Sequence, residues 1–119
     1  MQTREIQEDV WIDFFRQFSR DHVGWPVTIE VLSPESGPQR LLQDQPLQGI
    51  SFDVAGTRPC TIQVGAGDNP AANFSHVIDL PLHIRLADDG EAGASGTIEI
   101  EPARGAPTLV HFHSPRPIA

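Results

Sequence analysis

The sequence predicts an α+β domain in which an N-terminal helix packs on an antiparallel sheet of about six short strands. Apolar residues recur at helical spacing in the first part of the chain, and short segments that alternate apolar and polar residues follow. The segments between these candidate strands are too short for the crossovers that parallel strands need. A chain of 119 residues can bury one core without disulfide support, so residues 1–119 are expected to form a single domain.

The helix is expected over about residues 4–22. Its apolar side chains form one stripe, which predicts a face packed against the sheet. Acidic residues lie in its first turns and basic residues in its last turns, as the helix dipole favours, and Thr3 is the expected N-cap. The stripe contains Ile6, Val10, Trp11, Phe14, Phe15 and Phe18.

A Gly-Trp-Pro segment is expected to end the helix. Gly24 should have a positive φ, because glycine adopts the left-handed conformation with the least strain, and Pro26 prevents helical continuation. Phe14 and Phe18 are expected to be almost wholly buried. Trp25 and the helix aromatics are expected to belong to the core rather than to a ligand cage.

The β-rich part is expected over about residues 27–113, with residues 114–119 as a tail. Pro81 cannot donate a ladder hydrogen bond, so it marks an edge or a bulge. Strands this short could also curl into a small barrel of the SH3-like or Sm-like kind. The expected strands are 27–32, 47–55, 60–64, 76–86, 97–101 and 108–113.

The charge of the chain restricts its partners. Its formal net charge is −8, and all eight basic residues are arginines. This acidity argues against binding of nucleic acid through phosphate neutralisation and against an anionic membrane surface, and it suits a basic protein partner. The single cysteine, the absence of a long apolar run and an acidic N-terminus predict a cytoplasmic protein. The oligomeric state stays open.

Several segments of the chain resemble an uncharacterised bacterial group, domain-of-unknown-function family 5335. The resemblance begins with REI and continues through W-x-x-FF-x-x-FS-x-x-H-x-GW-x-VT-x-EVL and PL-x-GIS to the final IEIEPARGAPTLVHFHSP. It spans nearly the whole chain, and the middle segment GAGDNPAANFSHVIDLPLHI matches only loosely. The family has no established activity, so the resemblance implies a fold unit and no site residues.

Histidines are the first candidates for chemistry. His111 and His113 lie two residues apart in a strand and should point to one face. With His83 from another strand, and with Asp79 or Glu99, they could hold a metal ion. The competing interpretation is a solvated outer face, because Val110 and Phe112 occupy the inner one.

Other candidate sites have simpler structural interpretations. Cys60 alternates with apolar residues and is expected to be a small buried side chain. The segment GAGDN at 65–69 is followed by no helix and has no lysine, so a turn is favoured over a phosphate loop. Glu99 and Glu101 share a face and are expected to be solvated. No cofactor is expected.

These observations favour a non-enzymatic accessory or protein-interaction module. An acidic surface with exposed strand edges could pair with a protein partner. The alternative is a small metal- or ligand-binding enzyme that uses His83, His111 and His113. An RNA-binding barrel is disfavoured by the acidity, unless Arg58, Arg85 and Arg104 form a basic patch.

Overall fold

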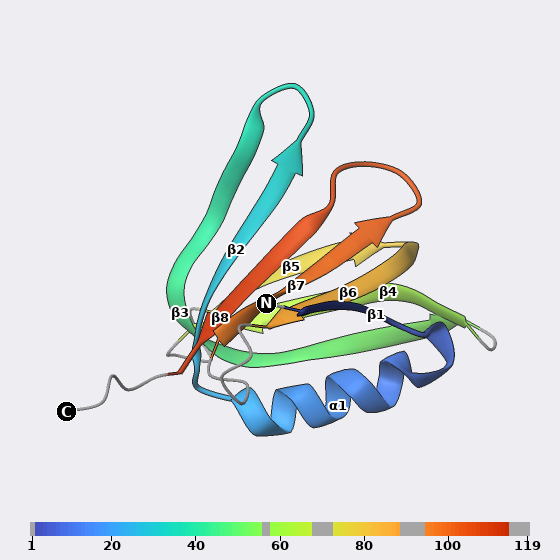
Figure 1. Cartoon of the computed structure of the whole chain (residues 1–119), viewed down its shortest axis with the longest axis horizontal. Helices are drawn as coiled ribbons and strands as arrows, with labels where there is room; N and C mark the ends of the chain where they lie inside the picture. The colour runs from blue at the N-terminus through green and yellow to red at the C-terminus, as the bar shows by residue number, and fades with distance from the viewer. Residues whose placement is uncertain (1, 56–57, 68–72, 89–94, 115–119) are drawn as a thin grey trace.

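The computed structural model describes residues 2–55, 58–67, 73–88 and 95–114. It confirms the α+β class: one N-terminal helix, α1 (Trp11–His22), packs on an open sheet of eight strands. All strand pairs are antiparallel, and the spatial order is β1-β6-β7-β8-β2-β3-β4-β5. Figure 1 shows α1 along one side of the molecule and the β2–β3 hairpin projecting away from it.

The strands differ widely in length. A short 3-10 helix (Glu8–Val10) connects β1 to α1. The bounds are β1 (Gln2–Ile6), β2 (Pro26–Ser33), β3 (Gly37–Ala55), β4 (Arg58–Ala66), β5 (Phe74–Asp79), β6 (Pro81–Asp88), β7 (Ser95–Pro102) and β8 (Thr108–His113).

Strand β3 connects the two parts of the sheet. Its 19 residues pair first with β2, from Gly37 to Pro46, and then with β4, from Leu47 to Ala55. The second part of β3 runs beside α1 (Figure 1). There Ser19 Oγ accepts a hydrogen bond from the Ile50 N–H at 2.9 Å and donates one to the Ile50 carbonyl at 3.3 Å. Ser19 of the helix thus supplies a hydrogen-bond partner for the Ile50 N–H and C=O, in the part of β3 that does not pair with β2.

The core lies between the two parts of the sheet and α1. Strands β4 and β5 contact β6 and β7, so the sheet folds over on itself without closing within the described residues. Phe15 lies 5.4 Å from Phe52 of β3, and Phe18 lies 5.0 Å from Phe112 of β8. The buried apolar residues are Ile6, Trp11, Phe15, Phe18, Val27, Ile29, Leu47, Ile50, Ile62, Val64, Ala66, Ile78, Ile84, Leu86, Ile98, Ile100, Val110 and Phe112.

The predicted start of the helix is wrong. Residues 2–6 form β1, which pairs with β6 in register from Gln2↔Asp88 to Ile6↔Ile84. The helix therefore begins at Trp11, whose indole N–H donates to the Ile6 carbonyl at 2.8 Å, and Thr3 is not its N-cap. The Ile6–Trp11 hydrogen bond fixes the corner where the chain leaves the strand.

The buried stripe of the helix is rotated relative to the prediction. Trp11, Phe15 and Phe18 are buried, whereas Val10 is 44% exposed and Phe14 is only partly buried. The predicted burial is therefore confirmed for Phe18 and wrong for Phe14.

Two strand predictions also change. Strand β3 begins ten residues earlier than the predicted 47, at Gly37, because β2 pairs with its first part. The predicted strand 76–86 is two strands separated at Leu80, which has φ 51°. Leu80 and Leu82 are 57% and 46% exposed. A register shift between Pro81 and His83 is consistent with the predicted edge or bulge at Pro81.

The Gly-Trp-Pro segment is arranged as predicted. Gly24 has φ +87°, which confirms the left-handed conformation, and its N–H donates to the Leu47 carbonyl at 2.8 Å. Trp25 is partly buried and packs against the core.

Candidate functional site

The predicted metal ligands lie on the outer face of the sheet, but each makes a separate contact. His83 Nδ1 lies 2.8 Å from Glu5 Oε2 of β1. His111 lies between Thr97 Oγ1, 2.8 Å from Nδ1, and Glu30 Oε1, 3.0 Å from Nε2. Strand β7 lies between the strands that carry His83 and His111.

His113 extends away from these two contacts. Its Nε2 lies 3.4 Å from Asp44 Oδ1, and its side chain is 55% exposed. Within the described part of the chain, no three His, Cys, Asp or Glu side chains are grouped to hold a metal ion. The side chain of Cys60 lies outside the described residues, as do residues 68–69 of the GAGDN segment.

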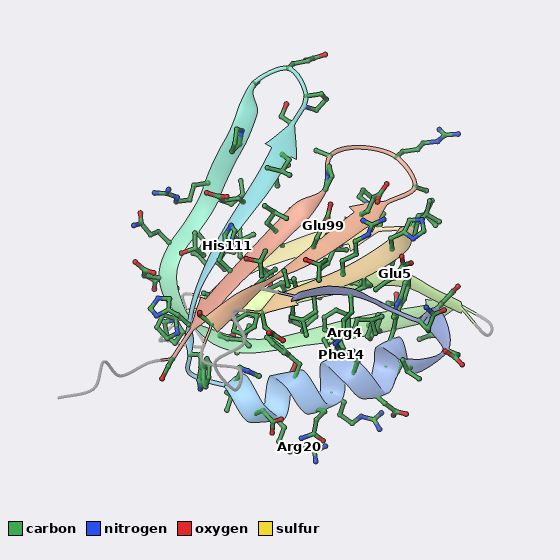
Figure 2. All side chains as sticks on the ribbon, viewed as in Figure 1. Arg4, Glu5, Phe14, Arg20, Glu99 and His111 are labelled. Atoms are coloured by element: carbon green, nitrogen blue, oxygen red, sulfur yellow. The ribbon has the colours of Figure 1, made fainter. Side chains whose placement is uncertain are left out.

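Glu99 and Glu101, the predicted acidic pair on β7, both contact an arginine. Arg85 of β6 contacts Glu101 at 2.9 Å and Glu99 at 3.4 Å. These carboxylates raise the pKa of the Arg85 guanidinium, chiefly through the hydrogen bond with Glu101, and the hydrogen bond with His83 lowers the pKa of Glu5. Figure 2 shows Glu99 and His111 on this part of the sheet. Because Arg85 faces carboxylates, it does not contribute to a basic patch; the side chain of Arg58 lies outside the described residues.

Strand β5 forms one edge of the sheet. It is last in the strand order, so within the described residues its outer edge has no neighbouring strand. Its segment, FSHVID, carries no formal charge except at Asp79, and Val77 is 50% exposed. The sequence did not distinguish this edge, because the strand order depends on pairings between distant segments.

A hollow of about 210 Å³ lies beside β5. Residues from β2 and the β7–β8 connection close its other side. Ile78, Val31 and Ala106 supply apolar lining, whereas Asp79 and Arg104 are the charged residues. The full lining is Val31, His76, Val77, Ile78, Asp79, Pro102, Arg104, Ala106 and Thr108.

His76 bridges the two parts of the sheet at this hollow. Its Nε2 lies 3.0 Å from Oγ1 of Thr108 in β8, and Thr108 is only 2% exposed. Burial lowers the pKa of His76, which favours the neutral ring.

Two grooves of different chemistry flank α1. One, of about 720 Å³, lies against β3–β5 and is lined by uncharged residues except Arg16. The other, of about 520 Å³, lies against β1, β6 and β8 and combines aromatic with acidic residues, including Phe14, Phe18 and Asp21. Only the second groove contains carboxylates, so only it favours a cationic ligand.

Comparison with protein families supports the resemblance to family 5335 described above. No curated protein and no solved structure matches this chain. Within the described residues no helix is long and apolar enough to cross a membrane. The model of a family of unknown function, DUF5335, matches residues 2–119. The chain therefore belongs to the DUF5335 family.

Proposed function

We propose that this chain is a non-enzymatic protein-interaction module that binds an extended segment of a partner protein along β5. The observation that carries the proposal is an accessible strand edge whose one formally charged residue is the terminal Asp79, directly beside a hollow of about 210 Å³. Such an edge can bind a further strand through main-chain hydrogen bonds.

The two edge strands of the sheet differ in charge. Strand β1 carries two charged residues, Arg4 and Glu5, among its five, and such charges discourage pairing with another strand. Strand β5 carries only Asp79, at its end. An added strand is therefore favoured at β5.

The hollow would select one side chain of the added strand. Successive side chains of a strand point to opposite faces, so every second residue of the segment would face the interior. Val31, Ile78, Pro102 and Ala106 favour an apolar side chain there. Arg104 makes no ion pair with any described residue and could contact an acidic group of the segment at the rim.

The test is selection of binding peptides from a displayed library, followed by mapping on the ¹⁵N-labelled protein. We expect selected peptides to be extended and to carry one apolar anchor. Their binding should shift the amide signals of Phe74–Asp79 and slow hydrogen exchange there.

Val77→Lys should weaken binding strongly, because a lysine on an edge strand opposes strand addition. Val54→Lys is the matched control, since Val54 is 43% exposed on β3 and lies outside both β5 and the hollow beside it. Selected peptides that bind both variants equally, or that shift signals only outside β5, would contradict the proposal.

A further inference from the structure

We propose a second binding site, the aromatic groove between α1 and strands β1, β6 and β8. Its ligand is a short segment of a partner protein in which an apolar side chain is flanked by lysine or arginine. The groove shares no lining residue with the hollow beside β5, so the two sites can be tested separately.

The groove has an apolar floor. Phe18 packs edge-on against Phe112 at 5.0 Å and is stacked near Phe14 at 6.1 Å. Leu86 of β6 continues the floor, and Val10 at its end is 44% exposed. A volume of about 520 Å³ is sufficient for a large apolar side chain and the backbone beside it.

The rim of the groove is acidic. Asp13, Gln17 and Asp21 follow one another at four-residue spacing, which places them along one side of α1. The Gln17 amide donates to both carboxylate oxygens of Asp21, at 3.0 and 3.1 Å, and so orients that group. Asp88 lines the groove from β6.

Among the described residues, little basic charge opposes Asp13 and Asp21. Arg16 lies 3.9 Å from Asp13, but both side chains are largely exposed, at 66% and 83%, so the pair is weak. The chain as a whole has a formal net charge of −8. The groove therefore complements a ligand that carries positive charge on both sides of an apolar group.

His22 supplies a fixed hydrogen-bond acceptor at the end of the aromatic row. Its Nδ1–H donates to the Phe18 carbonyl at 2.8 Å, and its ring stacks on Phe18 with centroids 4.0 Å apart. In the neutral ring this leaves Nε2 as an acceptor, and no described residue donates to it. A lysine or arginine N–H of the ligand can do so.

Arg4 is the one arginine that lines the groove. It lines the groove together with Phe14 and makes no hydrogen bond or ion pair with the described residues. A guanidinium can pack favourably over an aromatic ring. Because the Arg4 side chain is exposed and makes no such bond, it can move aside when a lysine or arginine of the partner binds.

The experiment uses a short synthetic peptide with one phenylalanine flanked by arginines and a second peptide with glutamates in place of the arginines. Calorimetric titration of the full chain should detect binding of the basic peptide only. Binding should change the fluorescence of Trp25, whose ring lies 4.4 Å from His22. Asp13→Asn combined with Asp21→Asn should weaken binding about fivefold, as expected for the loss of two exposed charge contacts.

The matched control is Asp9→Asn combined with Glu35→Gln, which removes the same charge from exposed residues outside the groove. This control should bind like the wild type. Equal weakening by both double variants would show general charge attraction and overturn the proposal. Benzylammonium binding as tightly as the peptide would overturn the protein-partner assignment, and loss of peptide binding in Val77→Lys would place the site at β5 instead.

Discussion

Adjacent phenylalanines in α1 have different roles. Phe15 is wholly buried against Phe52, whereas Phe14 is partly exposed over the aromatic groove. Phe15 is therefore a core side chain, whereas Phe14 is one that a ligand in the groove can contact.

Truncation of these two residues should have unequal effects. Phe15→Ala should lower the free energy of unfolding by about 3–5 kcal/mol, because it leaves a cavity among packed neighbours. Phe14→Ala should cost substantially less, since part of that ring already faces solvent. Urea denaturation of both variants measures the difference, and equal losses would contradict the burial described above.

His76 should make the free energy of unfolding decrease at acidic pH. Its pKa is lowered by burial from the ordinary 6.5, so the unfolded chain binds the proton more readily than the folded one. The contribution of neutral His76 to stability is present above pH about 6.5 and is lost as the pH falls toward the folded pKa. His76→Gln should flatten this part of the stability–pH curve, measured by urea denaturation at a series of pH values. A curve unchanged by the substitution would rule out His76 as its source.

At the scale of elements, the contact of α1 with β3 depends on one hydroxyl. Ser19→Ala would leave the part-buried Ile50 N–H and C=O without this partner and should cost about 1–3 kcal/mol. Thermal denaturation measures the loss. Ser51→Ala is the control, because Ser51 is exposed on the next position of β3 and should change the melting temperature little.

Local patterns in the sequence predicted the elements whose pairing and burial are regular. Strand β8 has the predicted bounds, and Gly24 has the predicted φ. Strand β1 was missed because Ile6 is its only large apolar residue and its partner β6 lies far along the chain. The first part of β3 has adjacent leucines and flanking prolines instead of alternation, and pairing with β2 holds it extended.

The candidate sites were less predictable than the fold. The spacing of His111 and His113 identified a shared face, but not the carboxylates that each ring contacts. The edge position of β5 and the grooves beside α1 depend on the strand order and on the rotation of the helix. Neither property is encoded in a short segment of sequence.

At the scale of the whole molecule, the charge predicts no affinity for nucleic acid. Arg85 is already paired with two glutamates, and the formal net charge is −8. Mixed-sequence RNA and DNA should therefore not bind at physiological salt in a fluorescence anisotropy titration. Micromolar binding that weakens steeply with added salt would contradict this expectation.

The continuity of β3 restricts how the length of this chain can change. One strand pairs with β2 along its first part and with β4 along its second, and its register with β4 shifts at Leu47/Gly49 and Asp53/Val54. Because strand side chains alternate between faces, deletion of one residue within β3 would turn every side chain on one side of the deletion away from its proper face. Insertions and deletions should therefore be tolerated in the turns of this domain and excluded from β3, where each would alter two registers at once.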